Sequence, residues 1–227
     1  MKYLTIFTLL LAILTGCNSG QAAGNTFEGH IQYTIEYQPQ QTFLDRHYFE
    51  EKRGTAIHYY YKQGDYLRVY LTPDGDTCRF ELYKIKENRI YFSTDLSTDT
   101  VYTYSCAEGY GDLLSFRKTE SKPMLNQETV SYECTMRYDQ ASAPGPPFQV
   151  AVKMFYGPSI KIDGSIYADY KEGFYNKFAE ASNSLPLRTE VKGDPLADQI
   201  IQATDVKQQS LDDKLFNKSS NWKIVER

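Results

Sequence analysis

The sequence predicts an α+β fold that is mainly antiparallel β: a curled sheet or half-barrel, packed against a long helix in the C-terminal half and a short helix near the N-terminus. Apolar and polar residues alternate over many short stretches, such as Ile31 to Tyr37 and Val130 to Tyr138, as half-buried strands require. Turn-forming residues separate these stretches, which is typical of antiparallel hairpins. The chain also holds 20 tyrosines and 12 phenylalanines but one tryptophan, a composition that favours sheets.

Residues 1–17 have the features of a lipoprotein export signal. Lys2 places one positive charge ahead of the apolar run Tyr3 to Leu14, which is too short for a permanent membrane-spanning helix. The following Leu14-Thr15-Gly16-Cys17 resembles the lipobox of bacterial lipoproteins. This resemblance implies cleavage after residue 16 and diacylation of Cys17, and several acyl chains anchor a protein firmly to a membrane. An ordinary signal peptide with a cysteine nearby is the alternative.

We therefore expect a signal peptide over residues 1–16, a flexible tether over residues 17–26 and a single half-barrel-like domain over residues 27–227. The tether is small and polar, so it has little to bury. Asn18 follows the cysteine in place of aspartate, and no acidic run comes after it. By resemblance to known lipoprotein sorting, this favours a lipid anchor in the outer membrane and a periplasm-facing domain. The formal net charge is −4 without clustered lysine or arginine, so nucleic acid is not an expected partner.

Two segments depart from the period of two. Thr42 to Arg53 has a capping-box-like start and Gly54 at its end, which predicts the short helix. From about Ser165 to Asn183, four apolar residues spaced by four predict the long helix, although Gly173 costs about 1 kcal/mol relative to alanine. We expect this apolar stripe to fill the curl of the sheet and to form the wall of any pocket that remains, which explains it better than a cofactor site does. The stripe consists of Ile166, Tyr170, Phe174 and Phe178.

Between these segments, regular turns predict a meander of five short strands from Thr55 to Cys106, then strands at Val130 to Tyr138 and Phe148 to Tyr156. Ala107 to Gln127 is less patterned and is predicted to be an irregular crossover, and Ile200 to Val206 carries a last strand.

Several stretches of the sequence also resemble those of a known protein family. The matching stretches are Glu128 to Cys134, Met154 to Pro158, Leu185-Pro186-Leu187, Ala203-Thr204-Asp205 and Leu211 to Phe216. The chain resembles uncharacterised lipoproteins of Bacteroidetes whose domain is similar to the half-barrel of the Lol-type lipoprotein carriers. The resemblance implies a sheet curled around helices, with an apolar concavity suited to acyl chains or another hydrophobic partner, and it supplies no catalytic residues. Because a carrier must diffuse and this chain is expected to be anchored, a resident binding protein or an acceptor fits better.

The usual catalytic and metal-binding patterns are missing from the sequence. No nucleophile motif accompanies the histidines, adjacent carboxylates splay apart rather than share a site, and the acidic turn lacks the spacing of a calcium loop. We therefore expect no enzyme activity, no cofactor and no bound metal. The residues weighed were His30, His47, His58, Glu50-Glu51, Asp212-Asp213 and Asp74-Gly75-Asp76.

If Cys17 carries lipid, Cys78, Cys106 and Cys134 remain. Three cysteines in an oxidising compartment permit one disulfide and one free thiol. We favour Cys106 with Cys134 because both fall on alternating apolar faces, although connectivity does not follow from sequence.

Two function classes fit these observations. The first is a lipid-anchored envelope protein that binds a hydrophobic ligand or an acylated partner in the concavity of the curled sheet. The second is a structural lipoprotein that docks an envelope complex through a tyrosine-rich outer face. Tyrosine suits half-wet sheets as well as interfaces, so composition alone does not separate them.

Overall fold

The strands of this computed structural model, which describes residues 26–139 and 146–227, form one twelve-stranded sheet. Its order is β12-β6-β5-β4-β3-β2-β1-β11-β10-β9-β8-β7. β12 runs parallel to β6, and the other neighbouring pairs are antiparallel. The first half of the sheet consists of β1 (Gly29–Pro39), β2 (Ala56–Lys62), β3 (Asp65–Leu71), β4 (Thr77–Lys84), β5 (Arg89–Ser93) and β6 (Thr100–Ser105). The second half consists of β7 (Asp112–Thr119), β8 (Val130–Tyr138), β9 (Phe148–Lys161), β10 (Ser184–Lys192), β11 (Ala197–Gln208) and β12 (Lys223–Glu226).

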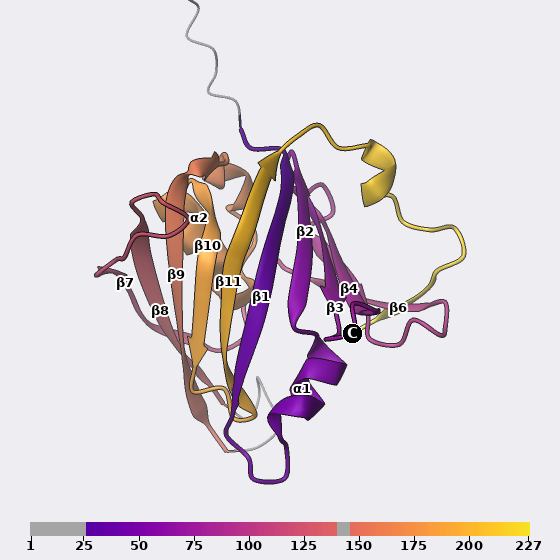
Figure 1. Cartoon of the computed structure of the whole chain (residues 1–227), viewed down its shortest axis with the longest axis horizontal. Coiled ribbons are helices and arrows are strands. Elements are labelled where there is room, and N and C mark those ends of the chain that lie inside the picture. Colours follow the sequence, from indigo (N-terminus) through magenta and orange to yellow (C-terminus); the bar gives the residue numbers. More distant parts are fainter. Residues whose placement is uncertain (1–25, 140–145) are drawn as a thin grey trace, which may run out of the picture.

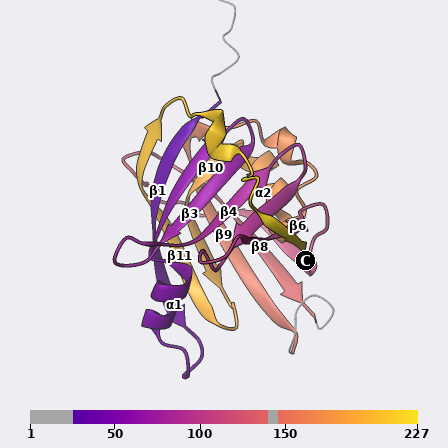
Figure 2. The same ribbon diagram turned by 90° about the vertical axis from the view of Figure 1, so that its right-hand side faces the viewer.

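The sheet curls but stays open. Figure 1 shows β7 to β10 on one side of the molecule and β2 to β6 on the other, with β1 and β11 between them. β7 and β12 are the two free edges, and the view in Figure 2 shows the curl from the side of the β12 edge. The predicted meander is confirmed as β2 to β6, whereas the predicted crossover contains an additional strand, β7. This strand was missed because it is an edge strand whose side chains are mostly exposed, so it lacks the alternation on which the prediction depended.

The prediction of a long C-terminal-half helix is wrong. The segment consists of two short 3-10 turns, η1 (Gly164–Tyr167) and η2 (Glu172–Phe174), followed by the eight-residue helix α2 (Tyr175–Ser182). Gly173 and Phe174 have φ angles of 55° and 56°, which lie in the left-handed region and cannot continue a right-handed helix. The fold is therefore one open sheet with two short helices among the described residues, and not a sheet packed against a long helix.

The short N-terminal helix is α1 (Arg46–Arg53). The Asp45 carboxylate accepts a hydrogen bond from the Tyr48 amide at 2.8 Å, so Asp45 caps the helix in place of the predicted Thr42. Gly54, with φ of 86°, ends it, as a residue without Cβ can. The aromatic ring of Phe49 anchors α1 by stacking on Tyr37 with 5.4 Å between ring centroids.

The two faces of the sheet are covered differently. On the outer face of β4 to β6, the C-terminal segment buries Leu211 and Phe216, the latter in the turn η3 (Asp213–Phe216), against Leu82 and Tyr91. Trp222 stacks on Phe80 with 5.3 Å between ring centroids. On the inner face, tyrosines of adjacent strands stack in a row, because residues paired across antiparallel strands share one face. Tyr59, Tyr66 and Tyr83 form this row, with centroids 5.5 and 5.1 Å apart.

Candidate functional site

The inner face of the curled sheet contains two adjoining cavities. The smaller, about 150 Å³, lies among β1, β2, β3, β9, β10, β11 and the start of α2. The larger, about 460 Å³, extends toward β4, β5, β6 and β8. Arg68, Met154 and Tyr175 line both, so the two cavities lie side by side. The smaller is lined by Tyr33, Ile57, Tyr59, Arg68, Tyr70, Met154, Tyr175, Pro186, Thr189 and Ile201.

Most walls of this concavity are apolar or aromatic. Ile90, Met136, Val150, Val152 and Phe148 contribute to the larger cavity. These residues belong to strands on opposite sides of the curled sheet. Because each occupies an inward-facing position of its strand, their side chains line the same space.

The tyrosine rings of the inner face are held by their hydroxyls. Tyr33 donates to the Pro186 carbonyl at 2.8 Å, and Tyr37 donates to the Gly54 carbonyl at 3.0 Å. The hydroxyls of Tyr66 and Tyr170 bind each other at 2.9 Å. A buried hydroxyl with a partner avoids the cost of desolvation, so these rings are held in place, and those of Tyr33 and Tyr170 form part of the cavity walls.

Tyr59 and Tyr175 differ from the other wall tyrosines. Within the part of the chain that the structure describes, neither hydroxyl makes a hydrogen bond to the protein, and both side chains line the smaller cavity. Burial raises the pKa of both phenols, so each hydroxyl keeps its proton and can donate it to a hydrogen bond.

A group of charged side chains stands in the wall of the concavity. Arg68 of β3 lies opposite Glu81 of β4 in the strand register, and its Nη1 is 3.3 Å from Glu81 Oε2. Arg79 binds the other carboxylate oxygen at 3.1 Å, and the Tyr70 hydroxyl donates to Oε2 at 3.0 Å. Although Arg68 lies deep in the curl, 34 % of its side-chain surface is accessible, because both cavities open onto it.

Glu172 brings a second carboxylate to the larger cavity. It accepts a hydrogen bond from the Tyr104 hydroxyl at 3.0 Å, and the Cys106 thiol lies 3.9 Å from its other oxygen. Burial raises the pKa of Glu172, and the charge of Glu81 adds to this, while the Tyr104 hydrogen bond opposes it. The hydrogen bonds of Glu172 thus come from neutral groups, unlike those of Glu81.

The four residues predicted to form the pocket wall do not share one face. Tyr170 lines the larger cavity, but Ile166 is 39 % exposed. Phe178 is fully buried and packs edge-on against Phe116 at 5.2 Å, away from both cavities. Phe174 is half-buried and packs against the same cluster as Phe178. Of the four predicted residues, Tyr170 alone lines either cavity, and most of the wall consists of strand residues.

Arg68, Glu81 and Glu172 were not predicted as site residues. One signal was available for Arg68, since Tyr66, Arg68 and Tyr70 alternate along one strand and must share a face. No signal in the sequence shows that Glu81 and Glu172 approach the same space, because this depends on strand pairing and on the turn at residues 172–174.

The predicted Cys106–Cys134 disulfide is not present. Cys78, Cys106 and Cys134 are free thiols, and Cys17 lies outside the described residues. Cys106 is buried near Glu172, whereas Cys134 lies in β8 within a separate apolar cluster. Burial raises the pKa of Cys106 to about 12 and that of Cys134 to about 11, so neither is a reactive thiolate at neutral pH.

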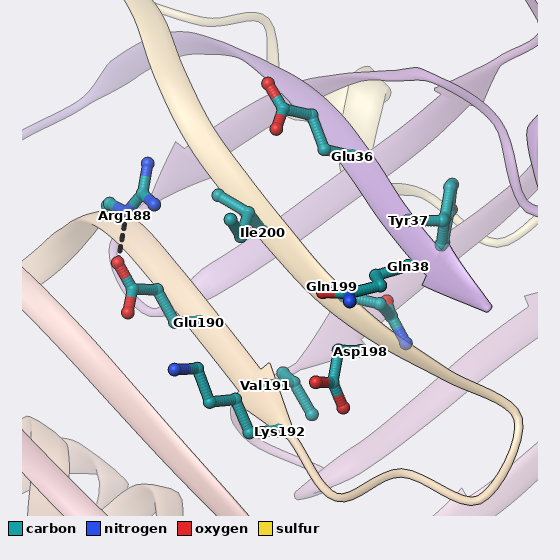
Figure 3. A pocket seen from close by; sticks show the side chains of 10 residues that line it. All are labelled: Glu36, Tyr37, Gln38, Arg188, Glu190, Val191, Lys192, Asp198, Gln199 and Ile200. Carbon is teal, nitrogen blue, oxygen red and sulfur yellow. Dashed lines mark hydrogen bonds and ion pairs between the residues drawn. The ribbon is translucent and has the colours of Figure 1, made fainter. Parts of the chain in front are cut away.

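Apart from the two cavities of the concavity, a hollow of about 360 Å³ lies between β1, β10 and β11 (Figure 3). Two of its charged groups form an ion pair: Arg188 contacts Glu190 at 2.6 Å, and it also donates to the Gln202 side chain at 2.8 Å. Lys122 lies 3.5 Å from the same glutamate. Glu36, Lys192 and Asp198 also line this hollow, so its lining is more strongly charged and less apolar than that of the concavity.

The histidines lie away from the concavity. His30 and His58 follow the outward positions of β1 and β2, with ring centroids 4.9 Å apart. His47 is exposed on α1. Across residues 26–139 and 146–227, no group of three or more histidine, cysteine, aspartate or glutamate side chains is placed to hold a metal ion. In the same residues, no helix is long and apolar enough to cross a membrane.

The chain matches no protein-family model, and no curated protein matches its sequence. Membership of the resembling lipoprotein family therefore stays a prediction. Among solved structures, PNGF-II is similar with a TM-score of 0.44 and 16% identity, over 88% of this chain and 31% of PNGF-II. The chain thus spans about a third of the length of that protein.

The structures to which the chain is similar also include a LolA superfamily protein. NE2245 from Nitrosomonas europaea has a TM-score of 0.36 and 9% identity, over 85% of this chain and 91% of that protein. LprF from Mycobacterium bovis has a TM-score of 0.29 and 8% identity, over 81% of this chain and 88% of that protein. These scores lie below 0.5, so no function passes from these proteins to this chain.

Proposed function

We propose that this chain is a lipid-anchored binding protein of the bacterial cell envelope, and that it accommodates a hydrophobic ligand or an acylated partner in the concavity of its sheet. The observation that carries this proposal is the pair of adjoining cavities lined by aromatic and aliphatic side chains. Small-molecule sites are commonly concave and mostly apolar, with volumes of about 300–1,000 Å³. The anchor is Cys17, and its sequence context favours the periplasmic side of the outer membrane.

The packing of the concavity supports binding by a preformed site. Hydrogen bonds fix the ring of Tyr33 to the Pro186 carbonyl and that of Tyr170 to the Tyr66 hydroxyl, and ring stacking fixes Tyr59 against Tyr66. A ligand that enters between fixed walls loses its own freedom but does not have to order the protein. Each methylene group that it buries contributes about 0.8 kcal/mol, so an acyl chain is a suitable occupant.

Docking through a tyrosine-rich outer face has less support. Most of the described tyrosines are buried or half-buried. Among the described residues, the exposed tyrosines are Tyr48 and Tyr110. The tyrosine content is explained by the inner face and the core, so the observation that suggested a docking surface no longer requires one.

The proposal is tested by asking whether lipid occupies the concavity. We would purify the chain from its native membrane and measure non-covalently bound lipid by mass spectrometry, for the parent and for Thr189→Phe. Thr189 lines the smaller cavity, and a phenylalanine there fills the space that a ligand needs. We expect stoichiometric lipid in the parent and a large loss in the variant.

A matched control is Thr34→Phe, which makes the same change at an exposed position on the outer face of β1. It should retain as much lipid as the parent. A parent protein that carries no lipid and binds no apolar probe would refute the proposed function, as would equal retention by the two variants.

A further inference from the structure

We propose that the ligand of the concavity is an amphiphile with an acidic head group, and that Arg68 binds this group together with the hydroxyls of Tyr59 and Tyr175. This inference rests on the proposed function and names the chemical class of the ligand. The shared chemistry is a carboxylate or phosphate at the end of a long apolar chain.

The position of Arg68 is the first reason. Its side chain lines both cavities, so a group bound there lies where the two spaces adjoin. A guanidinium carries five N–H donors, and within the described chain Arg68 has one hydrogen bond, to Glu81 at 3.3 Å. The remaining donors are free to bind an anion, and the rings of Tyr66 and Tyr59, with centroids 4.8 and 5.5 Å from the guanidinium carbon, fix its position.

The balance of charge is the second reason. Glu81 is shared between two arginines and a tyrosine hydroxyl, and its contact with Arg79 at 3.1 Å is shorter than its contact with Arg68. Among the described residues, Glu81 is the carboxylate that forms an ion pair with each of the two guanidinium groups. Arg68 is half-buried, and a partly desolvated cation is stabilised by a further counter-charge, which an anionic ligand would supply.

The other charged groups of the concavity line the larger cavity and not the smaller one. Among them are Glu172 and Asp194. An anion bound at the junction is therefore attracted by Arg68 at close range. Glu172 and Asp194 oppose it from the larger cavity, as does Glu81, whose charge is balanced by Arg68 and Arg79.

The polar groups around Arg68 complete a site for oxygen atoms. Tyr59 lies opposite Arg68 in the strand register, and Tyr175 lines the same two cavities as Arg68. Both hydroxyls lack a hydrogen-bond partner among the described residues, so each can donate to the oxygens of a head group. Ile57, Met154 and Ile201 form an apolar wall beside them, against which the chain of the ligand can pack.

The test compares ligands that differ only in the head group. We would use the full-length chain with Cys17→Ser, so that no covalent acyl chain competes, and measure displacement of a fluorescent apolar probe by hexadecanoate, hexadecyl phosphate and hexadecanol. We expect the two anions to bind at least about tenfold more tightly than the alcohol, because a hydrogen bond to a charged partner is stronger than one to a neutral group. Whichever anion binds more tightly identifies the head group as carboxylate or phosphate.

Two arginine variants locate the effect. Arg68→Gln should weaken the binding of the preferred anion by about 10- to 100-fold and leave hexadecanol within about threefold of the parent. The matched control is Arg79→Gln, which removes the other arginine from Glu81 but lines neither cavity, and it should bind the anions nearly as well as the parent.

Equal binding of hexadecanoate, hexadecyl phosphate and hexadecanol by the parent would overturn the inference while leaving the proposed function standing. An equal loss of anion and alcohol binding in Arg68→Gln would also overturn it. If Arg68→Gln does not fold, the comparison of ligands on the parent still decides. If the parent binds neither the probe nor any of the three ligands, it is the proposed function that fails.

Discussion

Glu172 is a half-buried carboxyl whose hydrogen bonds come from neutral groups, and this makes stability depend on pH. Its pKa is raised above the ordinary value of 4.5, first by burial. The folded state therefore binds its proton more tightly than the unfolded state does, so this group lowers stability as the pH rises from about 4.5 through the raised pKa. Above that pKa, the full cost of the buried charge is present.

We predict that Glu172→Gln raises the unfolding midpoint at pH 8, because the amide can still accept the hydrogen bond from Tyr104 but carries no charge. At pH 4 the midpoints of variant and parent should coincide. Thermal melts at both pH values measure this, with Glu180→Gln, at an exposed position of α2, as the control that should change neither. An equal gain at both pH values would contradict the electrostatic explanation.

The environment of some single residues could be predicted from the sequence, and that of others could not. The alternation of Ile31, Tyr33, Ile35 and Tyr37 predicted the buried face of β1 correctly, because burial follows the period of two. Arg68 was not recognised as part of a site, since a charged residue within an alternating stretch is usually solvated. Only the curl of the sheet places it inside.

At the level of the elements, the segment from residue 163 to 183 was the least predictable. The spacing of four among its apolar residues is typical of a helix, yet Gly173 and Phe174 break the helical path with positive φ angles. Phe178 and Phe174 consequently lie in different environments: Phe178 is fully buried, and Phe174 is half-buried.

We predict that Phe178→Ala lowers the free energy of unfolding by about 3–5 kcal/mol, the usual cost of truncating a buried phenylalanine. The ring contacts Phe116 and the cluster of Cys134, Met136 and Val150, so its loss leaves a cavity between α2 and the sheet. Phe174→Ala should cost clearly less, because that ring is partly solvated in the folded state. Denaturant melts compare the two variants, and equal midpoints would show that α2 is not held by Phe178.

At the level of the whole molecule, the concavity depends on pairing between distant parts of the chain. β1 pairs with β11 over the full length from Gly29 to Pro39, which joins the first meander to the later strands. The individual strands of both parts were predictable from local alternation. Their order was not, because no local pattern specifies which strands pair across more than 150 residues.

The predicted membrane anchor lies outside the part of the sequence that lines the concavity. The residues that line the two cavities fall between Tyr33 and Ile201, whereas Cys17 precedes the first strand and lies outside the described residues. Anchoring and ligand binding should therefore be separable, since the first depends on acyl chains attached to one residue and the second on side chains of the sheet.

We predict that Cys17→Ser releases the protein from the membrane fraction without changing its unfolding midpoint or its affinity for an apolar probe. Cell fractionation, a denaturant melt and a probe titration measure the three properties on the same variant. Ser19→Ala, which leaves Leu14-Thr15-Gly16-Cys17 intact, is the matched control and should stay in the membrane fraction. A Cys17→Ser protein that remains as firmly bound to the membrane as the parent would show that the anchor is not the acylated cysteine, and a shifted midpoint would show that the anchor contributes to the fold.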